Sequence, residues 1–159
     1  YAKTLAAGLR VGMLAASPDL IARLTDLKLL VGLTTPNLGE GVVHHLLHEG
    51  HYTRHVARLR QRIDAARHRC IEALLECGLT LSHLPYAGMF VWADCGQDAE
   101  GVARRAAEHG VLLAPGSLFS PTQAPSTMLR FTVSIIDTPK LWPVLRAILV
   151  RETERAGPA

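Results

Sequence analysis

The 159-residue sequence has few aromatic residues, few cysteines and no long apolar run. Aromatic residues make up 5% of it, and its three cysteines, Cys70, Cys77 and Cys95, have no Cys-x-x-Cys spacing. The cysteine pattern therefore predicts neither a disulfide framework nor a zinc knuckle, and reduced intracellular thiols are expected. Because the apolar runs are too short for a bilayer and no signal sequence is recognisable, we expect a cytoplasmic protein without a membrane partner.

A strong excess of charge of one sign is also missing. Seventeen Lys and Arg residues against 14 Asp and Glu residues give a net charge of +3. This is far from the clustered basic excess of a nucleic-acid surface, so no direct DNA binding is predicted. Apolar residues at 48% and charged residues at 19% are typical of one globular domain with a single core.

Three helices are predicted in the first half of the chain. Ser17 is a good N-cap for a helix over 18–31, which has proline in its first turn. A second helix is expected over 36–50. The third, over 52–77, has an apolar residue every three or four positions and ends at Gly78, which suits a left-handed cap.

The second half mixes strands and helices. Apolar or alternating patterns predict strands at 10–16, 80–85, 88–95, 111–115 and 128–134. Helices are expected at 98–109 and from Thr138 to about 156, and 116–127 is expected to be a loop. The order predicts an α/β fold (α+β sandwich) with a mixed or antiparallel sheet of three to four strands, covered by helices including one long helix.

The stretch "KTLAAGLRVG" contains a candidate reactive site. A lysine amine, here Lys3, is a nucleophile towards carbonyls when its surroundings lower its pKa. Arg10 has a planar guanidinium suited to two-point binding of phosphate or carboxylate, and Gly8 lets the backbone approach a ligand. Taken alone, these are more often ordinary solvated side chains.

Four segments that follow one another along the chain favour a reactive site over solvated side chains. "KTLAAGLRVG", "GMFVW", "APGSLF" and "MLRFTV" together resemble the second half of a fold-type I pyridoxal-phosphate aminotransferase. They are similar in particular to the aminotransferase-like domains of the MocR branch of GntR-type transcriptional regulators. The resemblance covers nearly the whole chain and implies the small C-terminal domain of the aminotransferase fold.

The resemblance implies roles for three residues. Lys3 matches the lysine that forms a Schiff base with the aldehyde of pyridoxal 5'-phosphate and moves the proton in amino transfer. Arg10 matches the arginine that pairs with the cofactor phosphate. Arg130 matches the arginine that binds the α-carboxylate of an amino acid, a role suited to its bidentate geometry. No metal is implied.

The resemblance also implies that other parts of the site precede this sequence. The serine of the S-x-x-K motif falls one place before Tyr1, and the partner of the pyridine nitrogen, the ring that stacks on the cofactor and the glycine-rich phosphate loop lie further upstream. Residues 1–16 are thus expected to be a remnant of the large cofactor-binding domain, comprising the lysine loop and a strand. Residues 17–159 are expected to be the small domain.

Other candidate sites have simpler interpretations. Four histidines, His44, His48, His51 and His55, are spaced like ligands on one helical face. Gly50 interrupts that face, however, and exposed or half-buried histidines are favoured over a metal site. Five arginines lie off the apolar stripe of the third helix and favour a solvated face over a nucleic-acid groove: Arg54, Arg58, Arg62, Arg67 and Arg69.

The aromatic residues of the strand and loop segments leave two alternatives open. The alternation of Phe90 and Trp92 is usual for sheet packing. The second alternative is that these rings, together with Phe119 in the "PGSLF" segment, contribute to the shape of a substrate site.

Three hypotheses for function remain. The first is the cofactor-binding effector domain of a homodimeric regulator that senses an amino acid or amine and binds DNA through an upstream winged helix. The second is a free-standing aminotransferase that exchanges an amino group between an amino acid and a 2-oxo acid. The third is a small α/β domain without activity, and for the isolated chain inactivity is expected under all three.

Overall fold

A computed structural model of the chain describes residues 1–34 and 36–153. The chain divides into two compact units, Tyr1–Arg60 and a second unit that begins at Gln61. One long helix, α3 (His51–Glu76), contributes to both. Among the described residues, none of the helices has the length and apolar character needed to cross a membrane.

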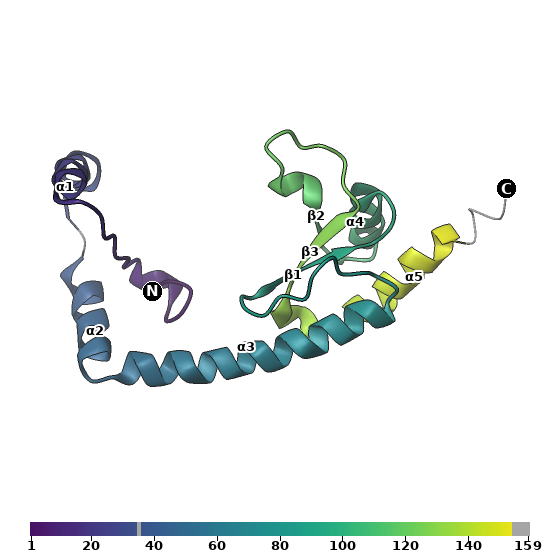
Figure 1. The fold of residues 1–159 in the computed structure, drawn as a ribbon, viewed down its shortest axis with the longest axis horizontal. Helices are drawn as coiled ribbons and strands as arrows, with labels where there is room; N and C mark the ends of the chain where they lie inside the picture. The colour runs from purple at the N-terminus through teal and green to yellow at the C-terminus, as the bar shows by residue number, and fades with distance from the viewer. Residues whose placement is uncertain (35, 154–159) are drawn as a thin grey trace. The chain divides into compact units, whose positions relative to one another are not determined.

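The first unit is built from helices (Figure 1). A short 3-10 turn, η1 (Ala7–Leu9), is followed by α1 (Pro18–Gly32), α2 (Asn37–His48) and the first turns of α3. The helices predicted from the apolar periodicity are therefore confirmed, with Ser17 at the N-cap of α1.

The strand expected at residues 10–16 is wrong, because these residues have no regular secondary structure. A strand exists only when its backbone amides and carbonyls pair with a neighbouring strand. In the described part of the chain the paired strands all lie in the second unit, from Phe90 onward.

The second unit contains a three-stranded antiparallel sheet with the order β1-β3-β2 (Figure 1). The strands are β1 (Phe90–Asp94), β2 (Ala114–Pro115) and β3 (Met128–Thr132). An antiparallel sheet of three strands is confirmed. The strand expected at 80–85 is reduced to one isolated bridge between Thr80 and Asp94, and the one expected at 111–115 is reduced to two residues.

One face of this sheet carries the core. Val91 and Ala93 of β1 and Leu129 and Phe131 of β3 alternate with more exposed neighbours and are at most 2% exposed. They pack with the C-terminal turns of α3, with α4 (Ala99–Glu108) and with α5 (Leu141–Thr153). The period-2 pattern therefore leaves the other face for Phe90, Trp92 and Arg130.

The last helix begins later than expected. α5 starts at Leu141, and the preceding residues form another 3-10 turn, η3 (Val133–Asp137). A helix capped by Thr138 would place Pro143 beyond the first turn, where its missing N–H would break a hydrogen bond. A start at Leu141 places Pro143 in the first turn, where that N–H has no intrahelical partner. Residues 154–156 of the expected helix lie outside the described residues.

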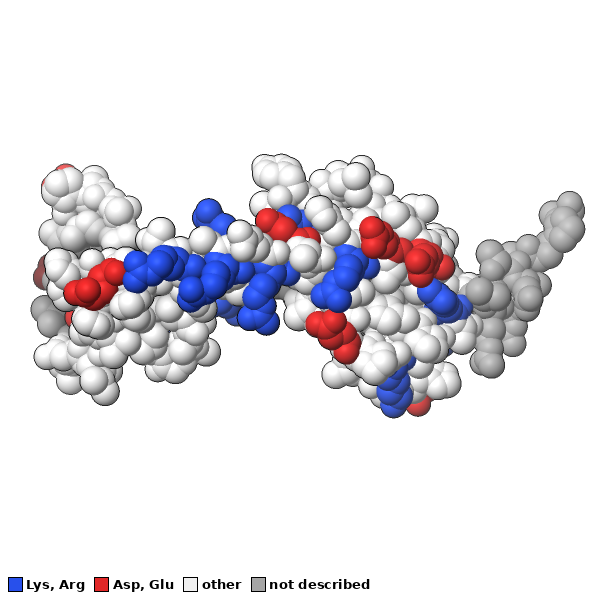
Figure 2. Space-filling model, turned by 90° about the horizontal axis from the view of Figure 1, so that it is seen from below, with Lys and Arg blue, Asp and Glu red and all other residues white. Residues whose placement is uncertain are grey.

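Basic side chains follow α3 along its length, as Figure 2 shows in blue. Five arginines of this helix are exposed: Arg54, Arg58, Arg60, Arg62 and Arg69. Arg69 pairs with Asp137 at 3.5 Å, and both side chains are more than half exposed. Exposed pairs of this kind contribute at most about 1 kcal/mol.

Candidate functional site

The candidate lysine lies in a loop that is held against the start of α3. This lysine loop comprises residues 1–10 and contains η1. His55 Nε2 donates a hydrogen bond to the Thr4 carbonyl oxygen at 2.7 Å, and Thr4 Oγ1 bonds the Tyr52 hydroxyl at 3.2 Å. Two side chains of one helix thus hold the residue that comes directly after Lys3.

Lys3 and Arg10 are both exposed at the surface of the first unit. Arg10 closes η1 in the left-handed region, with φ 50° and ψ 30°. A non-glycine residue there carries a cost of about 1–2 kcal/mol. No hydrogen bond or ion pair joins either side chain to another residue in the described part of the chain. One loop therefore presents a free amine and a free guanidinium.

An amine and a guanidinium have the chemistry that suits the aldehyde and the phosphate of pyridoxal phosphate. An amine combines with an aldehyde, and a guanidinium binds a phosphate through two N–H groups. Between them the backbone is open, because a Cβ placed on Gly8 would meet nothing within 4 Å.

The four histidines spaced like ligands on one helical face lie on two helices. α2 ends at His48 and α3 begins at His51, with Gly50 between them at φ +66°. The rings of His44 and His48 are stacked, with centroids 6.0 Å apart. Among residues 1–34 and 36–153, no three His, Cys, Asp or Glu side chains gather as metal ligands.

Arg130 lies on the sheet face opposite the core of the second unit. Its partner in the β1–β3 ladder is Trp92, and Phe90 lies one pleat further along β1 on the same face. The Arg130 guanidinium carbon is 4.3 Å from the centre of the Phe90 ring and 4.0 Å from that of Phe119. The guanidinium therefore lies over two aromatic faces.

The edge of the Arg130 guanidinium is left for a ligand. Stacking uses the faces of the planar group, whereas its N–H groups point outward in the plane. No hydrogen bond or ion pair joins Arg130 to another residue among those the structure describes. The donors of this guanidinium are therefore available to an anion.

A hollow of about 280 Å³ opens beside Arg130. Its walls are mainly apolar and include Phe90, Leu112, Ile135 and Leu141. The space beside the guanidinium therefore accepts an apolar group together with an anion.

Phe119 is positioned by the 3-10 turn η2 (Gly116–Phe119). A Cβ on Gly116 would collide with Ser126 Oγ and would lie 3.1 Å from the Met128 carbonyl oxygen, so the close approach of the turn to β3 requires glycine. Buried Ser117 donates to Glu100 Oε1 of α4 at 2.7 Å. The edge of one ring meets the face of the other where Phe119 packs on Trp92, with centroids 5.2 Å apart.

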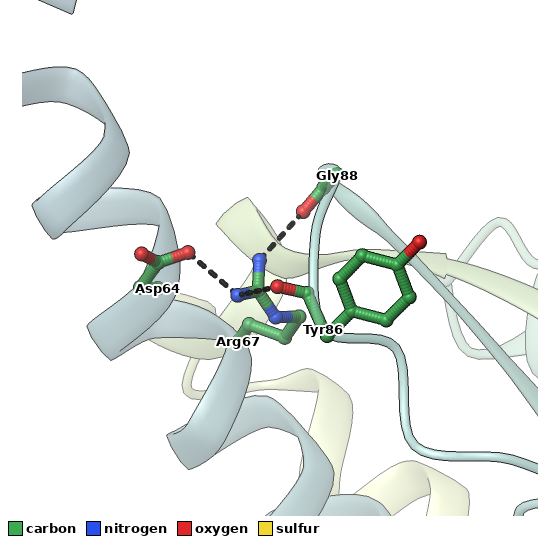
Figure 3. Close-up of polar contacts among 4 residues, drawn as sticks. All are labelled: Asp64, Arg67, Tyr86 and Gly88. Atoms are coloured by element: carbon green, nitrogen blue, oxygen red, sulfur yellow. Dashed lines mark hydrogen bonds and ion pairs between the residues drawn. The ribbon is translucent and has the colours of Figure 1, made fainter. Parts of the chain in front are cut away.

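Arg67 of α3 holds the segment that leads into β1 (Figure 3). Its guanidinium donates to the Tyr86 carbonyl oxygen at 3.1 Å, to the Gly88 carbonyl oxygen at 3.0 Å and to Asp64 Oδ1 at 2.5 Å. Arg67 is 3% exposed, so its expected place on a solvated face is wrong. The two carbonyls and the carboxylate accept hydrogen bonds from both terminal nitrogens of the guanidinium, whereas its buried Nε has no partner among the described residues.

The sequence pattern missed several of these contacts. The alternation within β1 and β3 shows which residues share a face in each strand. That Phe90 and Arg130 lie close together follows only from the register of the two strands, which the sequence pattern does not give. His55 and Arg67 carried no usable signal, because each bonds a carbonyl that is distant in sequence.

The sequence matches known proteins over most of its length. The family profile "Aminotransferase class I and II" matches residues 1–148. The 2-aminoadipate transaminase of Thermus thermophilus is 33% identical over 141 residues, which are 86% of this chain and 35% of the relative. The uncharacterised HTH-type transcriptional regulator YdfD of Bacillus subtilis is 26% identical over 140 residues, 85% of this chain and 29% of the regulator.

A solved structure has the same fold. The α-aminoadipate aminotransferase LysN of Thermus thermophilus, complexed with N-(5'-phosphopyridoxyl)-L-leucine, superposes with a TM-score of 0.79 at 30% identity. The match covers 94% of this chain and 41% of that chain. The chain spans about a third of the length of the two curated relatives.

Proposed function

Because the chain belongs to the class I and II aminotransferase family, we propose that it is the C-terminal part of a pyridoxal-phosphate-binding effector domain in a GntR/MocR-type transcriptional regulator. The regulator would be a cytoplasmic homodimer that binds DNA through an upstream domain and responds to an amino acid or amine. The alternative is the C-terminal part of a free-standing aminotransferase. The two share the same site residues and differ in the consequence of binding, which is a change in DNA binding for the regulator and amino transfer for the enzyme.

In this proposal each candidate residue binds one part of the cofactor or of the amino acid. Pyridoxal phosphate, when bound, supplies an electron sink for the carbon that carries the amino group. Lys3 binds the aldehyde end of the cofactor, and Arg10 binds its phosphate. Arg130 binds the α-carboxylate of the amino acid. In the enzyme alternative, Nζ of Lys3 also takes and returns the proton on the α-carbon.

The environment of Arg130 is the observation that carries the proposal. Its guanidinium is stacked between Phe90 and Phe119 and has donors to spare beside an apolar hollow. An amino acid presents a carboxylate next to its side chain, and this arrangement matches both groups.

Two observations bear on whether the full-length protein is a regulator or an enzyme. The segments from Gly32 to Asp64 and from Pro115 to Phe131 resemble the regulator branch, and YdfD is similar over 85% of this chain. The second candidate is supported by the higher identity, 33%, to a transaminase. An upstream winged helix in the full-length protein that binds operator DNA supports the regulator. Repeated turnover of an amino acid with a 2-oxo acid supports the enzyme instead.

The cofactor role is tested by spectroscopy on the full-length protein that contains this chain. We expect Lys3→Ala to abolish the absorbance band of the lysine-bound cofactor, because Lys3 is the residue that holds the aldehyde. Arg10→Ala should weaken cofactor affinity by roughly tenfold or more, in line with the strength of a bidentate charged hydrogen bond.

Two matched variants serve as controls. Lys28→Ala and Arg23→Ala remove exposed basic side chains of α1 and should leave the band and the affinity unchanged. A lysine-bound band that survives in Lys3→Ala would remove Lys3 from its proposed role.

A further inference from the structure

Arg130 is enclosed by rings from two different elements of the second unit. Phe90 is the first residue of β1, and Phe119 is the last residue of η2. Both ring faces are directed at the same guanidinium carbon, at 4.3 and 4.0 Å. We call Phe90 and Phe119 the aromatic cradle of Arg130.

Packing alone does not account for the cradle. Phe90 and Phe119 are each 42% exposed, and neither belongs to the apolar core, which lies on the other side of the sheet. Their most specific contact is with a cation, which the negative face of an aromatic ring attracts. The two rings therefore hold the guanidinium plane while remaining accessible themselves.

The surroundings hold the rings in place. Trp92, the ladder partner of Arg130, meets Phe119 at an interplanar angle of 84°. Arg67 bonds the Gly88 carbonyl, two residues before Phe90, and a side chain on Gly116 would push η2 away from β3. The Phe119 ring and the backbone that leads into Phe90 are thus each restrained by a contact that does not involve Arg130.

We propose that Phe90 and Phe119 are positioning residues that fix the plane of the Arg130 guanidinium and so make its site selective for ligands with a planar carboxylate. The inference rests on the proposed carboxylate role of Arg130 and goes further by assigning its orientation to two side chains. A long arginine side chain loses much rotamer freedom when it binds a ligand, and the cradle removes that freedom beforehand.

The geometry defines the class of ligand. A carboxylate lying in the guanidinium plane accepts two parallel N–H bonds from the unstacked edge. An amide, an ester or an amine accepts fewer charged hydrogen bonds in that plane. The cradle therefore improves binding of a free amino acid and leaves binding of the corresponding amine unchanged.

Paired ligands test this in the cofactor-loaded full-length protein. L-Leucine and 3-methylbutylamine, which is leucine without its carboxylate, are titrated while the absorbance of the bound cofactor is followed. We expect Phe119→Leu and Phe90→Leu each to weaken leucine binding by about fivefold, and the double variant by about 20-fold. The affinity for the amine should stay within about twofold.

The control variants distinguish the effect of the aromatic face from that of side-chain volume. Phe119→Tyr keeps the aromatic face and should restore the affinity for leucine. Tyr86→Leu removes an aromatic ring that is 95% exposed in the same unit and should change neither affinity. The cofactor band of each variant reports that the protein is folded.

The outcomes distinguish the two levels of the proposal. Leucine affinity that persists in both phenylalanine variants but is lost in Arg130→Ala overturns the cradle and leaves the proposed function standing. Equal weakening of leucine and amine binding also overturns the cradle. Leucine affinity unchanged in Arg130→Ala contradicts the carboxylate role itself and overturns both.

Discussion

Arginine takes three different environments in this chain, and each decides what the side chain does. Arg58 is exposed on α3, Arg67 is buried and bonded to two carbonyls, and Arg130 is half-buried between two rings. A charged group that is buried needs hydrogen-bond partners, whereas an exposed one has water. Of these three, Arg130 alone combines partial burial with unused donors, so it is the one suited to a ligand.

Burial also changes the chemistry of a cysteine in the core. Cys70 is fully buried in α3, and burial raises the pKa of its thiol to about 11. The folded state therefore favours the neutral thiol. Its contribution to stability is present below the ordinary thiol pKa of about 8.5 and is lost as the pH rises through about 11.

Cys70 should therefore make stability depend on pH in alkaline solution. The unfolding free energy of the unaltered protein should fall relative to Cys70→Ala by on the order of 2 kcal/mol between about pH 8 and about pH 11.5. Urea unfolding of both proteins across this range measures the difference. Parallel stability curves would contradict the prediction.

At the scale of elements, helices and strands differ in what they need. The apolar periodicity along α1, α2 and α3 was sufficient to predict these helices, because the backbone amides of a helix find their hydrogen-bond acceptors within the same segment. The strand patterns at 10–16 and 80–85 were not, because a strand needs a partner elsewhere in the chain. Beside β3 itself, the segments that became strands are those that pair with it.

The tie between α3 and the approach to β1 should be important for stability. Arg67→Met keeps most of the apolar stem but removes the donors to Tyr86 and Gly88. We expect a loss of about 2 kcal/mol of unfolding free energy, as for hydrogen bonds to a charged group. Urea unfolding of the variant measures the loss.

Two neighbouring variants on α3 serve as comparisons. Arg62→Met removes an exposed arginine and should change stability by less than about 0.5 kcal/mol. Asp64→Asn removes the negative charge of a side chain that is 55% exposed but keeps an oxygen that accepts from Arg67, so it should cost less than about 1 kcal/mol. If Arg67→Met behaves like Arg62→Met, the buried contacts do not stabilise the fold.

At the scale of the whole molecule, apolar burial is distributed unevenly. The main core cluster is formed by residues of the second unit, from Cys70 to Leu149. In the first unit, α1 has no buried residue, and its apolar side chains Leu20, Leu27, Leu30 and Val31 are 45–85% exposed. Because apolar burial is the main favourable term in folding, the two units should differ in stability.

Hydrogen exchange should reveal this difference in the 159-residue chain. We expect amides of β3, such as those of Leu129 and Phe131, to exchange at least roughly 100-fold more slowly than interior amides of α1, because opening α1 exposes little new apolar surface. Native-state exchange followed by NMR measures both sets. Equal protection in α1 and β3 would show that the units unfold together.

The sequence by itself determined the family, the three helices of the first half of the chain and the candidate residues Lys3, Arg10 and Arg130. These depend on motifs and on local periodicity, which are properties of consecutive residues. Only the tertiary structure decided which segments pair as strands, that Arg67 is buried, that His55 holds the lysine loop, and that Phe90 and Phe119 enclose Arg130. The physical reason is that each of these contacts joins residues far apart in the chain, and its energy exists only once the backbone has brought them together.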